Sequence, residues 1–315
     1  MKSPQPLYKG RPLDMSRESF GELRHSDSVL SAANELRQRM ADDGYLYLPG
    51  LLELDLVKAV RRDVFDRLAK LGALHPDYPA YEGISHPKPD RSVSAILDYR
   101  TDGSAESLSD CLPIKELLYK GRMISFFEHF LGGDVLCFNH IWFRAKDSAT
   151  GRSTPPHCDI LYMGRGTHNL FTAWVPYTDI DYDMGGVMLL EKSHQLEELR
   201  ESYCKRDIDV YDADHVDAPL IESGKKLWQK SGEYSLDAFS TREELGGRWL
   251  TAEFRMGDVL IFSPYIIHAS TDNHSPRMRI SSDTRYQLAS EPADERWAGP
   301  NPIGHGLKAK RAVHR

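Results

Sequence analysis

The hydrophobic positions of this 315-residue chain follow two different periods, and the change between them falls near residue 134. Before that point apolar residues recur every three or four positions, the period of a helix with one buried face. A glycine after the last apolar residue is a common helix stop. The YLYL run at 45–48 predicts a short strand. The predicted helices cover 29–43, 55–71 and 114–131, ending at Gly44, Gly72 and Gly132.

After residue 134 the chain consists of short β-rich runs that are separated by turn signals such as DMGG at 183–186. Several short strands at moderate spacing favour an antiparallel sandwich or barrel. Helices first and a barrel second is an α+β arrangement, and we expect the chemistry in the β part. The predicted strand runs are 135–145, 157–163, 169–177, 187–191, 249–254, 258–262 and 278–288.

We expect a single domain over residues 1–315, with mainly helical support over 1–133, a barrel core over 134–290 and a C-terminal tail over 291–315. A long insertion of charged, mixed sequence interrupts the core at about 195–250. Connections of this length are often lids or binding elements, and a purely structural insertion is the alternative. Trp228 and Trp249 are expected to give it apolar contacts.

Two charged runs lie outside the predicted strands. The acidic run at 207–217 is expected to be solvated surface, with a contact for a cationic or hydroxyl-rich substrate as the alternative. The basic run LKAKRAVHR at the C-terminus is expected to be a solvated, frayed tail. With a net charge of −7 and no basic stripe, the composition does not favour a nucleic-acid partner.

Composition also bears on the cellular setting. No apolar run approaches the roughly 20 residues of a membrane-spanning helix, and the polar start lacks a secretory signal. The four cysteines show no CxxC spacing, so we expect neither a zinc module nor a disulfide framework. These features predict a cytoplasmic protein with a small-molecule substrate and no membrane partner. The sequence does not reveal the oligomeric state.

Three residues with metal-ligand chemistry lie in the β-rich part, namely His157, Asp159 and His268. Residues two apart on a strand project to the same face, so His157 and Asp159 are predicted to point into one cavity while Cys158 faces away. His268 follows the apolar run GDVLIFSPYII and is expected at a strand end. Two imidazoles and one carboxylate form the facial set that binds iron(II) and leaves positions open for other ligands.

An arginine follows His268 about one strand later. Its guanidinium offers a planar fork that pairs bidentately with a carboxylate. Ser270 shares the face of His268 and is placed to join the arginine. Arg277 and Arg279 have the same strand parity, but Pro276 indicates that Arg277 is still leaving a turn, so Arg279 is preferred. Arg277 and Arg285 are expected to form surface ion pairs.

The chain resembles the phytanoyl-CoA dioxygenase-like family of iron(II)- and 2-oxoglutarate-dependent oxygenases. The matching stretches lie between residues 42 and 287: DDGYLYLPGLLELDLV, the HCD motif, TAWVPYTDIDYDMGGVMLLEKSH and GDVLIFSPYIIHASTDNHSPRMRISSDTRYQ. The resemblance implies a double-stranded β-helix, a jelly-roll or cupin-like barrel, supported by N-terminal helices. It also implies iron bound by His157, Asp159 and His268.

The resemblance further implies that Arg279 and Ser270 hold the C5 carboxylate of 2-oxoglutarate. Trp174 matches a family tryptophan expected to line the co-substrate pocket, with an ordinary core aromatic as the alternative, and Thr172 is a weaker candidate on the same strand face. No catalytic residue is predicted beyond the metal site. The chain departs from the family pattern at Cys158 and in the EKSH turn, where His194 is expected to be structural.

The implied reaction converts 2-oxoglutarate and O2 to succinate and CO2 while a C–H bond of a small metabolite is oxidised. Related halogenases carry Ala or Gly at the position of Asp159, so its carboxylate favours hydroxylation, or a variant such as desaturation, demethylation or cyclisation. Two alternatives remain. One is a non-catalytic barrel that keeps the metal-binding residues. The other is a cupin-like metalloenzyme without 2-oxoglutarate, which would not need Arg279 and Ser270.

Overall fold

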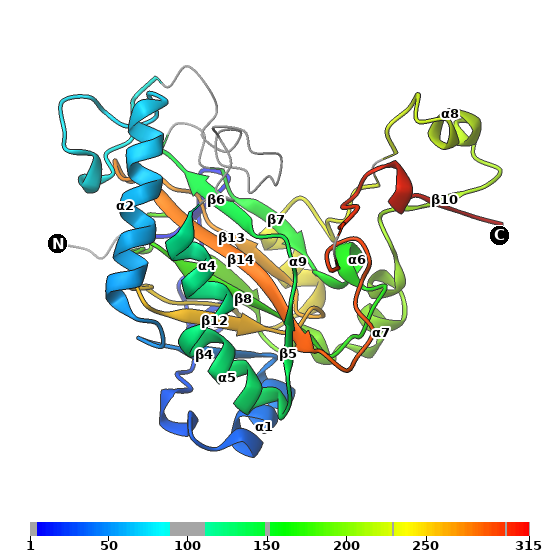
Figure 1. The fold of residues 1–315 in the computed structure, drawn as a ribbon, viewed down its shortest axis with the longest axis horizontal. Helices are drawn as coiled ribbons and strands as arrows, with labels where there is room; N and C mark the ends of the chain where they lie inside the picture. The colour runs from blue at the N-terminus through cyan, green and yellow to red at the C-terminus, as the bar shows by residue number, and fades with distance from the viewer. Residues whose placement is uncertain (1–4, 89–110, 149–151, 229, 300, 315) are drawn as a thin grey trace.

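The computed structural model describes residues 5–88, 111–148, 152–228, 230–299 and 301–314. Two sheets form the centre of the molecule (Figure 1). The six-stranded sheet has the order β4 (Tyr45–Leu48), β12 (Val259–Phe262), β8 (Leu170–Pro176), β14 (Arg279–Leu288) and β5 (Val135–Cys137), and β6 (Trp142–Lys146) also pairs with β14. The five-stranded sheet has the order β3 (Phe20–Glu22), β11 (Trp249–Thr251), β9 (Val187–Leu190), β13 (His268–Ser270) and β7 (Thr154–His157).

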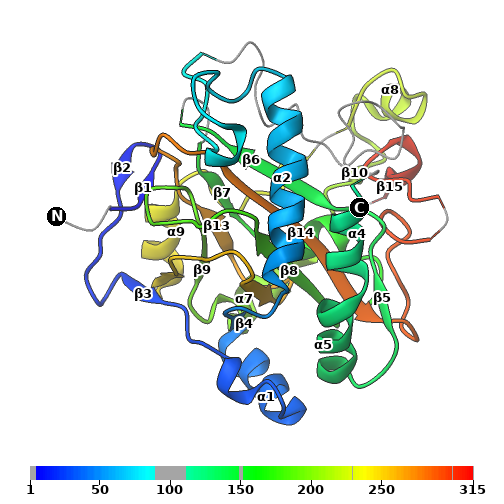
Figure 2. The ribbon, with the colours of Figure 1, turned by 60° about the vertical axis from the view of Figure 1, so that its left-hand side comes forward.

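Helices from the first 131 residues cover one face of the six-stranded sheet (Figures 1 and 2). Their apolar faces join alternate residues of that sheet in one buried cluster, and each fully buried large aliphatic or aromatic side chain contributes about 1.5–3 kcal/mol. These helices precede most of the strands in the chain, and they pack against the six-stranded sheet. The helices are α1 (Ala33–Asp43), α2 (Leu54–Lys70), α4 (Leu112–Tyr119) and α5 (Gly121–Leu131).

The third predicted helix, over 114–131, is in fact two helices. Lys120 is extended, with φ −147° and ψ −172°, and separates α4 from α5. Gly121 follows with φ +56°, a left-handed conformation that glycine adopts with little cost. The apolar positions keep the same period on both sides of this break, and for that reason the sequence pattern alone did not show it.

The strand predicted over 157–163 is also wrong. Strand β7 ends at His157, and Asp159 has helical dihedrals, with φ −68° and ψ −26°, just before the short helix α6 (Ile160–Met163). The other β-rich runs form strands, with 135–145 divided between β5 and β6. His157 and Asp159 therefore do not share a face by strand alternation. A turn at the end of β7 brings them together.

The insertion and the C-terminal tail pack against each other at one end of the molecule (Figure 1). Strand β10 (Val210–Asp212) pairs in parallel with β15 (Arg311–Val313), so the expectation of a frayed tail is wrong. Trp228 joins an apolar cluster within the insertion, whereas Trp249 belongs to β11 of the five-stranded sheet. The insertion also holds α7 (Glu197–Glu201), α8 (Ala218–Glu222) and α9 (Ala238–Leu245).

The remaining elements are short. Strands β1 (Leu7–Tyr8) and β2 (Arg11–Pro12) form a hairpin. All four cysteines are free thiols. None of the helices in the described part of the chain is long and apolar enough to cross a bilayer. The 3₁₀ turns are η1 (Asp27–Val29), η2 (Ala80–Glu82), η3 (Ser193–Gln195), η4 (Tyr203–Lys205) and η5 (Leu307–Ala309).

Candidate metal and carboxylate site

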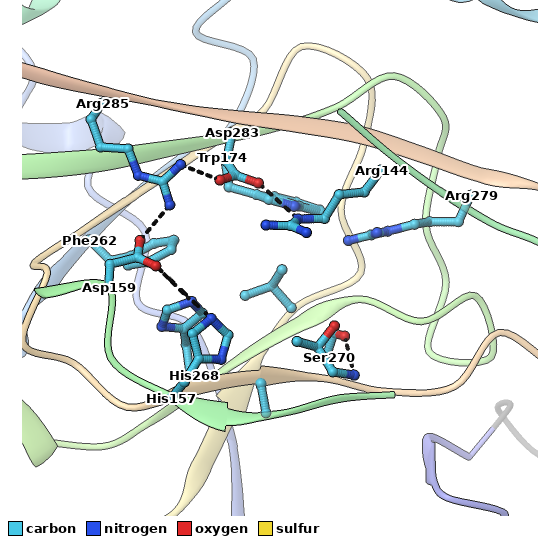
Figure 3. Close-up of a pocket in the computed structure, with 13 residues that line it drawn as sticks. Arg144, His157, Asp159, Trp174, Phe262, His268, Ser270, Arg279, Asp283 and Arg285 are labelled. Carbon is cyan, nitrogen blue, oxygen red and sulfur yellow. Dashed lines mark hydrogen bonds and ion pairs between the residues drawn. The ribbon is translucent and has the colours of Figure 1, made fainter. Parts of the chain in front are cut away.

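The three predicted metal ligands converge in one pocket between the two sheets (Figure 3). Asp159 Oδ1 lies 4.0 Å from His157 Nε2 and 3.7 Å from His268 Nε2. One ligand atom from each residue lies within 4.8 Å of the other two. His157 and His268 are paired residues on the adjacent strands β7 and β13, so the sheet register fixes the spacing of the two rings.

Each imidazole is oriented by a backbone carbonyl. His157 Nδ1 donates to Pro155 O at 2.8 Å, and His268 Nδ1 donates to Ile266 O at 3.2 Å. Both Nε2 atoms therefore lack a proton and face the centre of the site, as metal ligation requires. Burial and the neighbouring His157 lower the pKa of His268 to about 3, and burial also lowers the pKa of His157. Both rings are neutral at neutral pH.

Asp159 is oriented by two donors on its other oxygen. Thr172 Oγ1 donates to Asp159 Oδ2 at 2.6 Å and Arg285 Nη2 donates to it at 2.7 Å. Burial opposes ionisation, but Arg285 and the two histidines hold the pKa of Asp159 well below its usual value. Oδ1 therefore remains an ionised, available ligand atom. These donors and the neutral imidazoles give a donor set that fits a divalent ion such as iron(II).

The expectation of a surface ion pair for Arg285 is wrong. Its side chain is 3% exposed and bridges Asp159 and Asp283, with Arg285 Nη1 donating to Asp283 Oδ2 at 2.5 Å. The guanidinium also lies over the ring of Trp142, 4.2 Å from its centroid. Alternation along β14 could have indicated this position, because Arg285 has the parity of Arg279. Arg277, by contrast, is exposed as expected.

A second group of side chains lies on the opposite side of the pocket from the metal ligands (Figure 3). Arg279 is 1% exposed, and its Nε and Nη1 have no hydrogen-bond partner within the described residues. Trp174 lies under this guanidinium, 5.3 Å from ring centroid to Cζ, and its Nε1 also lacks a partner. A buried, unpaired guanidinium is costly, so this side of the pocket fits an incoming carboxylate.

The two predicted hydroxyl residues, Ser270 and Thr172, differ in their relation to the pocket. Ser270 lines the pocket, and its Oγ accepts from Lys146 Nζ at 2.5 Å and from Thr154 N at 2.9 Å. Thr172 is not among the residues that line the pocket, and its hydroxyl is committed to Asp159. The geometry therefore supports a role for Thr172 in positioning a metal ligand rather than in contacting a co-substrate.

The sequence interpretation missed two cations on β6. Arg144 lines the pocket and donates to Asp283 Oδ1 at 3.1 Å, and its side chain is 45% exposed. Lys146 is buried. Their alternation with Phe143 and Ala145, which join the core beneath the helices, was the signal that places both cations on the pocket face.

The start of the acidic run is not the solvated surface that was expected, whereas Asp214 later in the run is exposed. Asp209 is fully buried and pairs with Arg296 at 2.8 Å and with Lys310 at 2.6 Å. Asp207 pairs with Arg165 and Arg296. These ion pairs join the insertion to the C-terminal tail and to the loop that follows α6.

The insertion also reaches the metal site. Tyr234 N donates to Pro156 O at 2.8 Å, and Glu233 forms a β-bridge with His157. The segment around residue 233 thus extends the edge of the five-stranded sheet beside a metal ligand. His194 lies elsewhere, buried, with its Nε2 at 3.1 Å from Ala41 O, in agreement with its expected structural role.

Comparison with known proteins agrees with this site. The family model for phytanoyl-CoA dioxygenase (PhyH) matches residues 40–281. The chain is 27% identical over 270 residues to 1-deoxypentalenic acid 11-beta-hydroxylase of Streptomyces exfoliatus, covering 81% of this chain and 82% of the relative. It is 24% identical over 282 residues to the hydroxylase of the same name from Streptomyces arenae, covering 87% of each chain.

Solved structures share the fold. The epimerase SnoN, in complex with Fe3+, alpha ketoglutarate and nogalamycin RO, superposes with a TM-score of 0.52 at 20% identity, covering 88% of this chain and 94% of SnoN. EctD from S. alaskensis, with 2-oxoglutarate and 5-hydroxyectoine, gives 0.53 at 16% identity, covering 98% and 96%. The family match extends over most of the sequence and contains all three converging ligands. The chain therefore belongs to the phytanoyl-CoA dioxygenase family and is an iron(II)- and 2-oxoglutarate-dependent dioxygenase.

Proposed function

We propose that this protein hydroxylates a C–H bond of a small-molecule metabolite. One observation carries the proposal: a single pocket holds a two-histidine, one-carboxylate set at one side and an unpaired, buried guanidinium at the other. A metal site alone would suit many reactions. A metal site that faces an unpaired Arg279 suits a co-substrate that chelates a metal at one end and carries a carboxylate at the other.

In this proposal His157, Asp159 and His268 hold iron(II), and Arg279 holds the C5 carboxylate of 2-oxoglutarate with help from Ser270. Trp174 supports the guanidinium from below. In this proposal the two sheets together form the double-stranded β-helix that the family resemblance implies. The whole chain acts as one oxygenase domain, with the helices of the first 131 residues as its support.

Bound iron and 2-oxoglutarate supply the oxidising power, since 2-oxoglutarate, O2 and R–H together give succinate, CO2 and R–OH. The protein keeps the two histidine ligands neutral and Asp159 ionised, as a metal requires. Thr172 and Arg285 hold the Asp159 carboxylate in place. Because Asp159 is present as a carboxylate, the site favours hydroxylation over halogenation.

The pocket lining includes the aromatic rings of Trp174 and Phe262 and the half-exposed cation Arg144. Behind the lining, Trp142 covers Arg285, and Tyr162 packs edge-on against His157 with ring centroids 5.8 Å apart. Arg144 is the exposed member of the lining. These groups suit a small organic metabolite, and the two Streptomyces relatives described above are hydroxylases named for such a compound. The epimerase activity named for SnoN makes another oxidative outcome on the same iron site the second candidate.

The test is anaerobic addition of Fe(II) and 2-oxoglutarate to the purified protein, followed by visible absorption. We expect the weak charge-transfer band of the chelate, and we expect Arg279→Ala to weaken the binding of 2-oxoglutarate. Absence of a band would favour a non-catalytic barrel, and a band unaffected by Arg279→Ala would favour a cupin-like enzyme with another co-substrate. Product analysis after adding O2 and candidate metabolites separates hydroxylation from epimerisation, desaturation or cyclisation.

A further inference from the structure

Lys146 is a buried cation whose hydrogen bonds within the described residues go to uncharged groups. It lies on β6 directly opposite Arg279 of β14 in the antiparallel register. The lysine is 8% exposed and the arginine 1% exposed. The hydrogen bonds of Lys146 Nζ go to Ser270 Oγ at 2.5 Å and to Thr271 O at 3.1 Å. Across the described ranges neither cation forms an ion pair with a carboxylate.

Two neighbouring buried cations that form no ion pair are unfavourable, because each loses its hydration and repels the other. Asp272 near Lys146 and Asp283 near Arg279 offset this cost only in part. Burial, together with Arg279 and Arg144, lowers the pKa of Lys146 well below its usual value. Burial and Arg144 likewise lower the pKa of Arg279 to about 9. An anion bound between them would reverse both effects. The local charge is therefore arranged for a ligand that brings its own negative charge.

The hydroxyl of Ser270 links Lys146 to the pocket. A serine hydroxyl has two acceptor lone pairs and one proton. Its Oγ already accepts from Lys146 Nζ and from the backbone N–H of Thr154. Its proton is therefore left to donate to a third partner. Since Ser270 lines the pocket with Arg279, an acceptor in that pocket receives the proton.

We propose that Lys146 is a second cation of the site for the distal carboxylate of 2-oxoglutarate, where it positions Ser270 as a donor and adds its own charge to that of Arg279. This inference rests on the proposed function and goes beyond the Arg279 and Ser270 pair by assigning a role to a residue of β6. Lys146 is a positioning residue, because its contact with the carboxylate passes through the Ser270 hydroxyl.

The experiment measures binding to the Mn(II)-loaded protein by isothermal titration. Lys146→Met removes the charge but keeps the length of the side chain, and the fold should persist because an apolar replacement of an unpaired buried charge is neutral or stabilising. We expect the Kd for 2-oxoglutarate to rise about 10- to 100-fold, as for loss of a hydrogen-bonded charge. 2-Oxovalerate, with a methyl group at the distal end, should bind variant and wild type alike.

Two further variants distinguish this positioning role from a general effect of removing a lysine. Lys120→Met removes an exposed lysine, 66% accessible, and should leave the Kd unchanged. In a Ser270→Ala background, Lys146→Met should have a smaller effect, because the two residues act on one carboxylate. An unchanged Kd for 2-oxoglutarate in Lys146→Met, or an equal loss of affinity for Mn(II) and 2-oxovalerate, would overturn the assignment. If the wild type binds no 2-oxoglutarate at all, the proposed function itself fails.

Discussion

Replacing Arg285 with methionine should destabilise the metal-free protein by about 3–5 kcal/mol, the usual cost of leaving a buried charge without its partner. The perturbation is local and well defined. Arg285 is the shared partner of Asp159 and Asp283, at 2.7 and 2.5 Å, and the three side chains are 3–6% exposed. After the substitution Asp283 keeps Arg144, whereas Asp159 keeps only the Thr172 hydroxyl as a donor.

The magnitude follows from opposing contributions. At 2.7 Å and an effective dielectric constant of about 20, each pair gains about 6 kcal/mol of Coulomb attraction, and removal of the charges from water offsets much of that gain. Methionine restores packing against Trp142 but cannot donate to either carboxylate. The expected loss of stability therefore comes from leaving the buried Asp159 carboxylate without a charged partner. It does not come from a cavity.

Urea denaturation of the EDTA-treated protein, followed by circular dichroism, measures this loss as a change in midpoint at constant slope. Arg277→Met is the matched control, because Arg277 is exposed and surface changes stay within about 0.5 kcal/mol. Adding Asp159→Asn to Arg285→Met should recover part of the stability, because it removes the charge that was left without a partner. A loss for Arg285→Met below about 1 kcal/mol, or no larger than that of Arg277→Met, would refute the reasoning.

Three other changes test separate parts of the structure. Thr172→Val removes one donor to Asp159 and should weaken Mn(II) binding about 10-fold, as measured by titration; an unchanged affinity would contradict its positioning role. Gly44→Ala should cost about 1–3 kcal/mol, because Gly44 has φ +78° and a Cβ there would lie 2.5 Å from His194 Nδ1. Asp209 and Asp294 have lowered pKa values because the hydrogen bonds and charges of their basic partners outweigh burial. Their contribution to stability is therefore complete above about pH 4 and is lost as pH falls through the lowered pKa values. Asp209→Asn should make the free energy of unfolding depend less on pH in this acid range, as measured by denaturation at a series of pH values. An unaltered pH dependence would count against the ion-pair network.

Local patterns in the sequence predicted most of the helices and strands and the three metal ligands. Apolar periodicity predicted α1, α2 and most strands of the two sheets, because each of these elements buries one face and the period shows which face it is. The residue types His157, Asp159 and His268, with Arg279 one strand beyond, predicted a metal site beside a carboxylate site. The structure brings all four into one pocket.

Only the tertiary structure decided which charges are internal. Arg285, Lys146 and Asp209 each resemble surface residues in the sequence, since a charged side chain carries no local sign of what will cover it. Their burial depends on strands and loops that lie far away in the chain, such as β6 against β14 and the tail against the insertion. The sequence by itself determined the chemistry of the metal ligands. Long-range packing decided which donors hold Asp159 and why the C-terminal tail is ordered. It also placed Lys146 beside Arg279. Burial and ion pairing depend on neighbours in space, which the local sequence does not show.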